Sequence, residues 1–398
     1  MRVPLKKTIL PAYILSEAVG SWVSGTIYYI LWVTITKTAQ SPSFVAIWLI
    51  LPAITILSVS PVAAHLAEKL SAKYLSLLSL VLRVFGLICV VLILFALSKG
   101  WGIVPILCFG FLIILSSTID GVIHTAVPFI LAKTKAVNLI RFRVTLMLLM
   151  RGANVITPTL ALLLIGNLNL ALAILAGGSL ISFVASLILT YVSRDEPTQK
   201  KPPAKIGQMN LVVFYTILLF ALNAIFGHVT SIMLAVHALG ADQIAYQNAA
   251  FFVGFMAMSL LLIVKPKILS ALMDNTPAVL AGIIASLLML SASFGLSFFL
   301  DGMAKIVPIL GAGLTYGINL HLVTTILPSF LNIDKIYKDL NYGKIGATCG
   351  ALISGIWVAS LSTTNAGFEN GFIALSLGSL GLAFLLGLYW LHIHQKSA

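Results

Sequence analysis

Seven ionisable residues lie inside long apolar stretches of the 398-residue chain, where a charge needs a specific reason. These residues are Glu17, Arg83, Asp120, His124, Arg151, His228 and His321. An ionised side chain is costly in hydrocarbon, so such residues are usually paired or functional. Burial raises the pKa of a carboxyl group, whereas a neighbouring arginine lowers it. A group of acids with an arginine and a histidine can therefore bind and release protons, which is the chemistry of proton-coupled transport.

Within this set, Glu17 and Asp120 are the predicted proton-coupling residues. His124 follows Asp120 by four residues, so both project from one face of a helix and His124 can adjust the acid. Static roles are the alternative. Glu17 could form a permanent bridge with Arg151 or Arg83, and Asp120 could form a fixed hydrogen-bonded pair with His124.

The elements that carry these residues are predicted to be membrane-spanning helices. Hydrophobic residues make up 60% of the chain and charged residues 9%, against about 25% charged in soluble domains. The apolar runs are too long for the alternating strands of an outer-membrane barrel. A spanning helix needs about 20 apolar residues. Twelve segments qualify, at 10–35, 43–65, 75–98, 103–131, 144–166, 171–193, 211–238, 244–264, 277–299, 305–331, 344–363 and 371–391. The predicted fold class is an all-α membrane protein.

The basic residues set the orientation of these helices. Of the 24 Lys and Arg residues, 19 fall on one side of the predicted membrane and only Lys37, Lys99 and Lys305 on the other. The side rich in Lys and Arg is cytoplasmic, so both termini are expected in the cytoplasm. This distribution accounts for the net charge of +13 without a nucleic-acid partner. Residues 194–209 are polar and proline-rich, and predict a cytoplasmic linker between six-helix bundles at 1–193 and 210–398.

Six plus six spans around a basic linker are the layout of the major facilitator superfamily, and a local motif strengthens the resemblance. Residues 61–74 read PVAAHLAEKLSAKY, which resembles the superfamily's signature between helices 2 and 3. Glu68 matches its acid, and Lys69 and Lys73 match its bases. The resemblance implies that these three residues form a gate that stabilises one access state. The sequence also resembles the branch of macrolide-type and enterobactin-type exporters in three features: the glycines of the first span, Pro52 and Arg83.

The resemblance also implies a central cavity lined by helices 1, 4, 7 and 10. Glu17, Asp120, His124, His228 and His321 all fall on those four helices. Arg83 is expected to be structural, because helix 3 lies outside the cavity. The histidines could instead be satisfied by the amides one turn away. The predicted substrate-binding residues are Arg151, His228, His321, Asn223, Asn319, Trp22 and Tyr316.

Motifs for other chemistry are missing from the sequence. It contains no Walker loop, no HExxH and no cluster with metal-ligand spacing, so we expect neither an enzyme, nor a metal, nor a cofactor. The favoured hypothesis is a monomeric, proton-coupled exporter of a small organic molecule, drug-like or a siderophore, in the bacterial inner (cytoplasmic) membrane. Its partners would be the substrate, protons and the lipid bilayer. The alternatives are uptake of an organic anion, amino acid or peptide, a lipid flippase, and a scaffold with a transporter fold.

Overall fold

The structure is a computed structural model that divides the chain into two compact units. Unit 1 comprises Met1–Ala132, Leu149–Pro203 and Ile333–Ile345, and unit 2 comprises Lys133–Leu148, Ala204–Asn332 and Gly346–Ala398. The predicted linker 194–209 lies outside the described residues, and the predicted division at that linker stays a prediction. The structure describes residues 11, 14–23, 25–26, 42–70, 72–131, 141–150, 152, 167–192, 211–225, 242–272, 275–331, 336–360 and 365–397.

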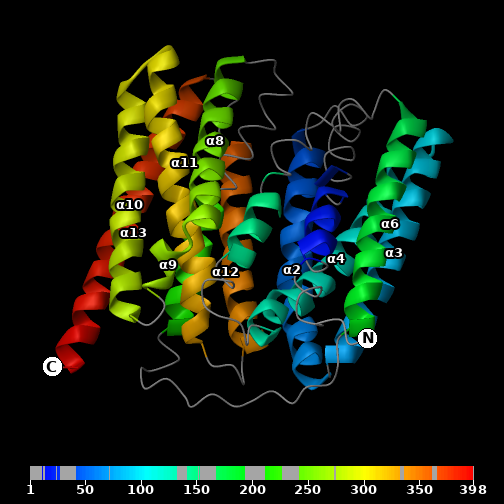
Figure 1. The fold of residues 1–398 in the computed structure, drawn as a ribbon. Coiled ribbons are helices and arrows are strands. Elements are labelled where there is room, and N and C mark those ends of the chain that lie inside the picture. The colour runs from blue at the N-terminus through cyan, green and yellow to red at the C-terminus, as the bar shows by residue number, and fades with distance from the viewer. Residues whose placement is uncertain are drawn as a thin grey trace. The chain divides into compact units, whose positions relative to one another are not determined.

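Unit 1 is built from antiparallel apolar helices (Figure 1). Its long helices are α2 (Pro42–Lys69), α3 (Ala72–Ser98), α4 (Ile103–Leu131) and α6 (Leu168–Val192). Helix α3 packs against α4 and α6, and α2 packs against α4. Residues 14–23 are helical as well. The sharp turn between α3 and α4 contains Gly100, whose φ of 64° suits glycine.

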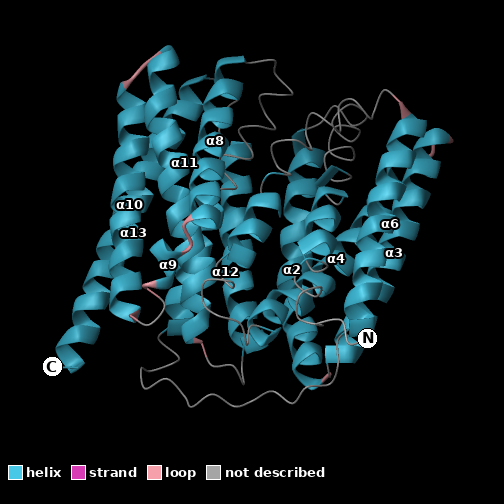
Figure 2. Cartoon of the chain, viewed as in Figure 1, coloured by secondary structure: helices cyan, strands magenta, loops and turns pink. Residues whose placement is uncertain are grey.

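Unit 2 contains the remaining long helices. They are α8 (Asp242–Val264), α10 (Thr276–Phe299), α11 (Ile306–His321), α12 (Ile336–Ser360) and α13 (Asn365–Ser397), with the short α9 (Lys267–Ser270) after α8. Helix α11 packs against α8 and α10, and α10 also packs against α13. Asn275 caps α10 by accepting a hydrogen bond from the Ala278 amide at 3.0 Å. The described residues contain no strand (Figure 2), as the apolar spans predicted.

Two of the differences between the predicted spans and the observed helices bear on the site. The span at 305–331 is not one regular helix, because α11 passes into a π-helical turn at Leu322–Ile326 and then a 3-10 turn at Leu327–Phe330. The buried Arg143 donates to the Thr324 carbonyl oxygen at 3.1 Å, so a side chain serves a backbone group within the irregular turn. The span at 344–363 begins too late, because α12 starts at Ile336. Lys338 and Lys344 therefore lie on a helix instead of in a loop.

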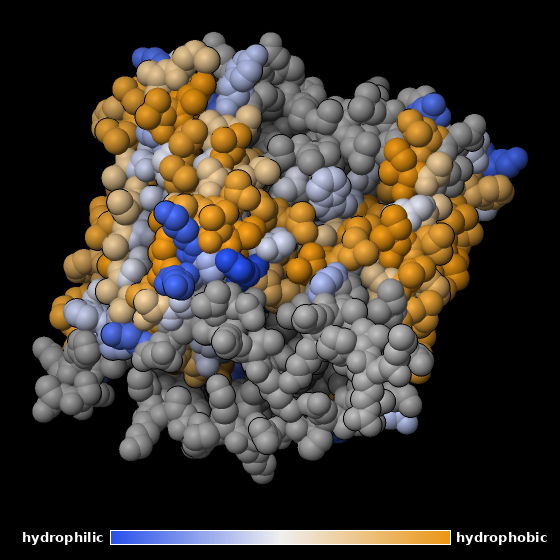
Figure 3. Space-filling model, viewed as in Figure 1, coloured by the Kyte–Doolittle hydropathy of each residue, from blue (hydrophilic) through white to orange (hydrophobic). Residues whose placement is uncertain are grey.

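The outer faces of the helices are apolar, as a lipid environment requires. On α3, Leu77, Val81, Phe85 and Ile88 are all exposed, and their spacing of three and four residues places them on one face. Figure 3 shows hydrophobic side chains over much of the described surface on the side in view. Within the described residues, five helical segments are long and apolar enough to cross a membrane. Exposed apolar faces of this length cannot be stable in water.

Glycine contacts bring helices of unit 2 unusually close together. A Cβ on Gly313 of α11 would lie 1.9 Å from the carbonyl oxygen of Phe251, and one on Gly254 of α8 would lie 2.2 Å from that of Leu310. The two backbones can approach only because each helix presents a glycine to the other. Gly350 of α12 plays the same role against Phe220, where a Cβ would lie 2.0 Å from the carbonyl oxygen. This part of α12 is therefore a packing surface.

We expect Gly313→Ala to destabilise the purified protein by about 1–3 kcal/mol, because overpacking forces the backbones apart. Thermal unfolding in detergent measures the effect. Gly387→Ala is the matched control, since nothing lies within 4 Å of a Cβ at Gly387 on α13, and alanine favours the helix. Equal melting temperatures for the two variants would contradict the packing role of Gly313.

Candidate functional site

Arg83 of α3 is the centre of a charged cluster inside unit 1. Its Nη2 atom contacts both a carboxylate oxygen of Glu17 and the Oδ2 atom of Asp120, the latter at 3.0 Å. Its Nη1 atom donates to the Ser16 carbonyl oxygen at 3.0 Å and to Ser182 Oγ at 2.7 Å. Four helical segments thus meet at one guanidinium group: residues 14–23, α3, α4 and α6.

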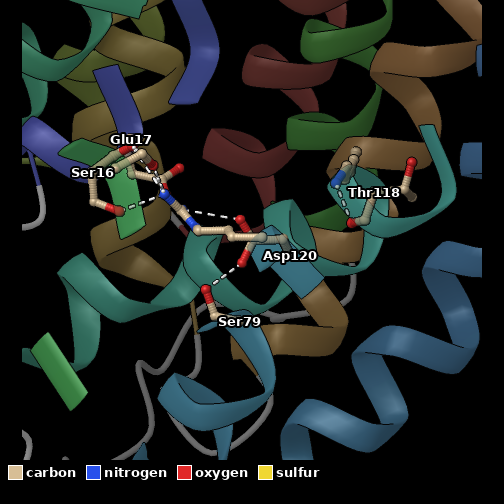
Figure 4. Close-up of polar contacts among 8 residues, drawn as sticks. Ser16, Glu17, Ser79, Thr118 and Asp120 are labelled. Atoms are coloured by element: carbon tan, nitrogen blue, oxygen red, sulfur yellow. Dashed lines mark hydrogen bonds and ion pairs between the residues drawn. The ribbon is translucent and has the colours of Figure 1, made fainter. Parts of the chain in front are cut away.

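Serines complete the cluster around the two acids (Figure 4). Ser79, one turn before Arg83 on α3, donates to Asp120 Oδ1. Ser182 also donates to the Ser16 carbonyl oxygen at 3.0 Å. These contacts hold the arginine and both carboxylates in place, as buried charges require. One guanidinium cannot neutralise two ionised carboxylates, so these three groups alone carry a net charge of −1.

The cluster is largely shielded from solvent, and this strengthens its electrostatics. The side chains of Arg83 and Glu17 are each 13% exposed, and that of Asp120 is 14% exposed. Two opposite charges attract more strongly where the effective dielectric constant is low. Neutralising either acid therefore changes the energy of its bond with Arg83 substantially.

A cavity of about 260 Å³ borders this cluster within unit 1. Glu17, Arg83 and Asp120 line it together with Gly20, Ser116 and Ser179. A water molecule occupies about 30 Å³ in the liquid, so the cavity has room for several. Its lining is mainly apolar apart from the charged cluster and serines. Water in this space can bring protons to the two carboxylates.

The two predicted acids come together at Arg83, and the contact of Glu17 with Arg83 is one of the pairings considered in the sequence analysis. Arg83 also lines the cavity inside unit 1, which is distinct from the central cavity implied by the resemblance. The role of Arg83 as a structural residue stays a prediction. His124 lies one turn after Asp120 on α4, as predicted, and its side chain is outside the described residues. Arg151, the other arginine weighed as a partner for Glu17, is outside them too.

The predicted substrate-binding residues do not form one described site. Trp22 in unit 1 donates to the Leu149 carbonyl oxygen at 2.8 Å. In unit 2, Asn223 donates to Leu219 of its own helix at 3.0 Å, and the buried Tyr316 packs against Phe251 and Phe255. Residue His228 lies outside the described residues.

His321 and Asn319 have separate partners on different helices. His321 Nε2 lies 2.9 Å from Ser259 Oγ of α8, so the histidine does not use the neighbouring amide proposed as its partner. Asn319 Nδ2 donates to Ser286 Oγ at 2.7 Å and to the Ile283 carbonyl oxygen at 3.2 Å, both on α10. These bonds tie α11 to two neighbouring helices.

The predicted gating residues flank a very short connection. Glu68 lies in the last turn of α2, which ends at the exposed Lys69, and Lys73 is the second residue of α3. The side chains of Glu68 and Lys73 are outside the described residues. Their gating role stays a prediction.

Ser16, Ser79 and Ser182 are site residues that sequence reasoning missed. A serine in a membrane helix usually bonds to its own backbone, so its type alone carries no signal. Ser79 had one available clue, because it precedes the buried Arg83 by one turn. Among the described residues, no group of three His, Cys, Asp or Glu side chains is placed to hold a metal ion.

We expect Arg83→Gln to destabilise the protein by about 3–5 kcal/mol, the cost of removing one partner from a buried ion pair. Thermal unfolding of the purified protein measures this loss. The triple variant R83Q/E17Q/D120N should regain part of it, because neutral amides leave neither carboxylate without its arginine. Lys267→Gln, at an exposed lysine, is the control and should change little. Further destabilisation by the triple variant would contradict the charge argument.

Solved structures with the same fold identify the architecture. A bacterial homologue of the iron transporter ferroportin, in an outward-facing state, matches with a TM-score of 0.71 at 15% identity, covering 98% of this chain and 99% of that one. The human organic anion transporter MFSD10 (TETRAN) matches with a TM-score of 0.63 at 11% identity, covering 97% and 100%. FucP, a major facilitator superfamily transporter in the outward conformation, matches with a TM-score of 0.61 at 13% identity, covering 96% and 98%.

Sequence comparison adds nothing to these structural matches. No protein-family model and no curated protein matches the sequence. At 11–15% identity, the structural matches establish the fold, and they do so over nearly the whole length of the chain. The predicted all-α membrane fold is thereby confirmed: the chain is a multi-pass membrane protein with the fold of the major facilitator superfamily.

Proposed function

We propose that the protein is a secondary active transporter that couples proton movement to the export of a small organic molecule. The observation that carries this proposal is the sharing of Arg83 by Glu17 and Asp120 beside a cavity. The fold supports it further, since each matched structure quoted above is of a transporter or of a transporter's homologue. We assign no enzymatic activity to the chain.

Competition for Arg83 supplies a physical reason for coupling. When a proton neutralises one acid, Arg83 can bind the other more strongly, and the pairing within the cluster shifts. An acid with different partners in two access states has two pKa values, and that difference links proton binding to the change of state. One pKa unit corresponds to about 1.4 kcal/mol. A difference of two units therefore biases the states by about 2.8 kcal/mol, within the range of allosteric couplings.

The proposed substrate is a drug-like compound or a siderophore, as in the exporter branch that the sequence resembles. Uptake of an organic anion, amino acid or peptide, and lipid flipping, are the alternatives to be tested alongside it. Two matched structures suggest additional probes, because one is of an organic anion transporter and another of a homologue of an iron transporter. Substrate contacts are proposed for Arg151, His228, His321, Asn223, Asn319, Trp22 and Tyr316.

The remaining assignments complete the proposed transporter. The two six-helix bundles, joined through residues 194–209, would alternate access in a bacterial inner membrane with both termini in the cytoplasm. Glu68, Lys69 and Lys73 would form the cytoplasmic gate, and His124 would adjust Asp120. The protein would act as a monomer.

We expect Glu17→Gln and Asp120→Asn to abolish gradient-driven transport but to preserve counterflow, because neutral amides remove proton loading and leave the substrate path intact. Proteoliposomes with an imposed pH gradient measure the first activity, and equal substrate on both sides without a gradient measures the second. The probes are ethidium, 2,3-dihydroxybenzoate and Mn²⁺, a cation, an anion and a divalent metal.

The control for this experiment is Ser98→Ala, at an exposed serine that bonds only to its own helix end among the contacts described. It should retain both activities. A purely structural bridge predicts a different outcome, in which the acid variants melt earlier and lose both transport modes together. Full gradient-driven transport by both acid variants would refute the coupling assignment.

We expect Glu68→Gln to slow transport several-fold while leaving the melting temperature nearly unchanged, because a gate biases access states without holding the fold together. Initial transport rates in the same proteoliposomes measure the effect. The control is Lys267→Gln, which changes an exposed charged residue at the start of the short helix α9. Normal transport by Glu68→Gln would mean that residues 61–74 are only a connector.

A further inference from the structure

Lys344 of α12 reaches the charged cluster of unit 1 from a distant part of the sequence. Its Nζ atom donates to the carbonyl oxygen of Thr118 on α4 at 3.2 Å, across 226 residues of chain. Thr118 lies half a turn before Asp120 on the same helix (Figure 4). Lys344 lies eight residues into α12, about 12 Å along the helix axis.

Gly121 leaves the space that the lysine occupies. A Cβ at Gly121 would lie 3.0 Å from Lys344 Nζ, closer than nearly any real contact of that kind. The residue beside Asp120 on α4 therefore has no side chain where the ammonium group lies. Backbone acceptor and glycine together define a seat for Lys344 next to the acid.

The carboxylates of the cluster attract this ammonium group. Lys344 Nζ is bonded to α4 only two residues before Asp120, so its positive charge lies near the cluster. Among the described residues, the cluster then has two acids, Glu17 and Asp120, and two bases, Arg83 and Lys344. The formal charge of these four groups is zero, which removes the excess of −1 that Arg83 alone leaves. A neutral cluster is the inexpensive state at membrane depth.

Helix α12, which carries Lys344, has residues in both units. The helix is continuous from Ile336 to Ser360, and its residues up to Ile345 belong to unit 1, whereas those from Gly346 belong to unit 2. Lys344 is therefore among the last residues of the helix that belong to unit 1. Farther along α12, Gly350 packs directly against Phe220 of unit 2. Lys344 therefore lies on the same continuous helix as a packing contact of unit 2.

We infer that Lys344 is the mobile counter-ion of the proposed coupling site, held at its seat by Asp120 and Glu17 only while both acids are ionised. Protonation of either acid leaves the four groups with a charge of +1, so Arg83 and Lys344 then compete for the remaining carboxylate. Arg83 contacts both carboxylates directly, whereas the hydrogen bond described for Lys344 runs to a backbone carbonyl oxygen, so Lys344 is the base that leaves. The start of α12 is thereby released by proton binding. This inference rests on the proposed function and names the element that the proton would move.

A double-mutant cycle between Lys344 and Asp120 tests the inference without a known substrate. Lys344→Gln leaves a charge of −1 and should lower the melting temperature by about 1 °C for each kcal/mol lost, the shift expected for a chain of 398 residues. In an Asp120→Asn background the same change restores neutrality, so it should raise the melting temperature or leave it unchanged. Lys344→Arg keeps the charge and should retain most of the wild-type stability.

Two controls separate charge from packing. Lys338→Gln removes an exposed lysine from the same helix and should have the same small effect in both backgrounds. A packing role for the Lys344 side chain predicts an equal loss of stability in both backgrounds, and that result would overturn the inference. If Lys344→Gln alone does not fold, recovery of folded protein in D120N/K344Q supports it, and failure of the double variant counts against it.

Transport measurements distinguish this inference from the proposed function. Lys344→Gln should lose the dependence of transport on the pH gradient while counterflow of the transported probe persists. If the wild-type protein transports none of ethidium, 2,3-dihydroxybenzoate and Mn²⁺, that result counts against the proposed function. The double-mutant cycle of melting temperatures still tests the interaction between Lys344 and Asp120 in that case. Retained gradient dependence in Lys344→Gln would overturn the inference while leaving the proposed function standing.

Discussion

An ionised group at membrane depth must be paired, and the charged cluster of unit 1 is arranged around this constraint. Arg83 satisfies it for two carboxylates at once, with serines from three helical segments supplying the remaining hydrogen bonds. Each of these segments is thereby fixed relative to α3. The arrangement is also sensitive to protons, because one positive group shared between two acids has no arrangement that suits both the ionised and the protonated state.

The fold was largely predictable from the sequence, because the bilayer fixes the length of an apolar helix. The predicted spans 103–131 and 277–299 match α4 and α10 to within one residue. The start of α12 was missed for a physical reason. Its first turns carry Lys338, Asp339 and Lys344, and these lower the hydropathy although the residues are helical. Hydropathy measures lipid-facing character, and part of this helix faces other protein groups.

The types of residue at the site could be predicted from the sequence, but their arrangement in space could not. Spacing within one helix places Asp120 near His124, whereas the meeting of Glu17, Arg83 and Asp120 depends on how three helices are rotated. No sequence period reports that rotation. The pairing of Glu17 with Arg83 was among the alternatives, because a charge at membrane depth requires a partner. The second contact of Arg83, with Asp120, follows only from the packing of α3 against α4.

Unit 2 differs from unit 1 in how its described buried polar side chains are paired. Its described core bonds are mainly neutral, between His321 and Ser259 and between Asn319 and Ser286, and aromatic rings pack beside close glycine contacts. Such contacts hold helices rigidly and do not depend on a single proton. Helix α12, whose residues are divided between the two units, is the element on which both kinds of contact act.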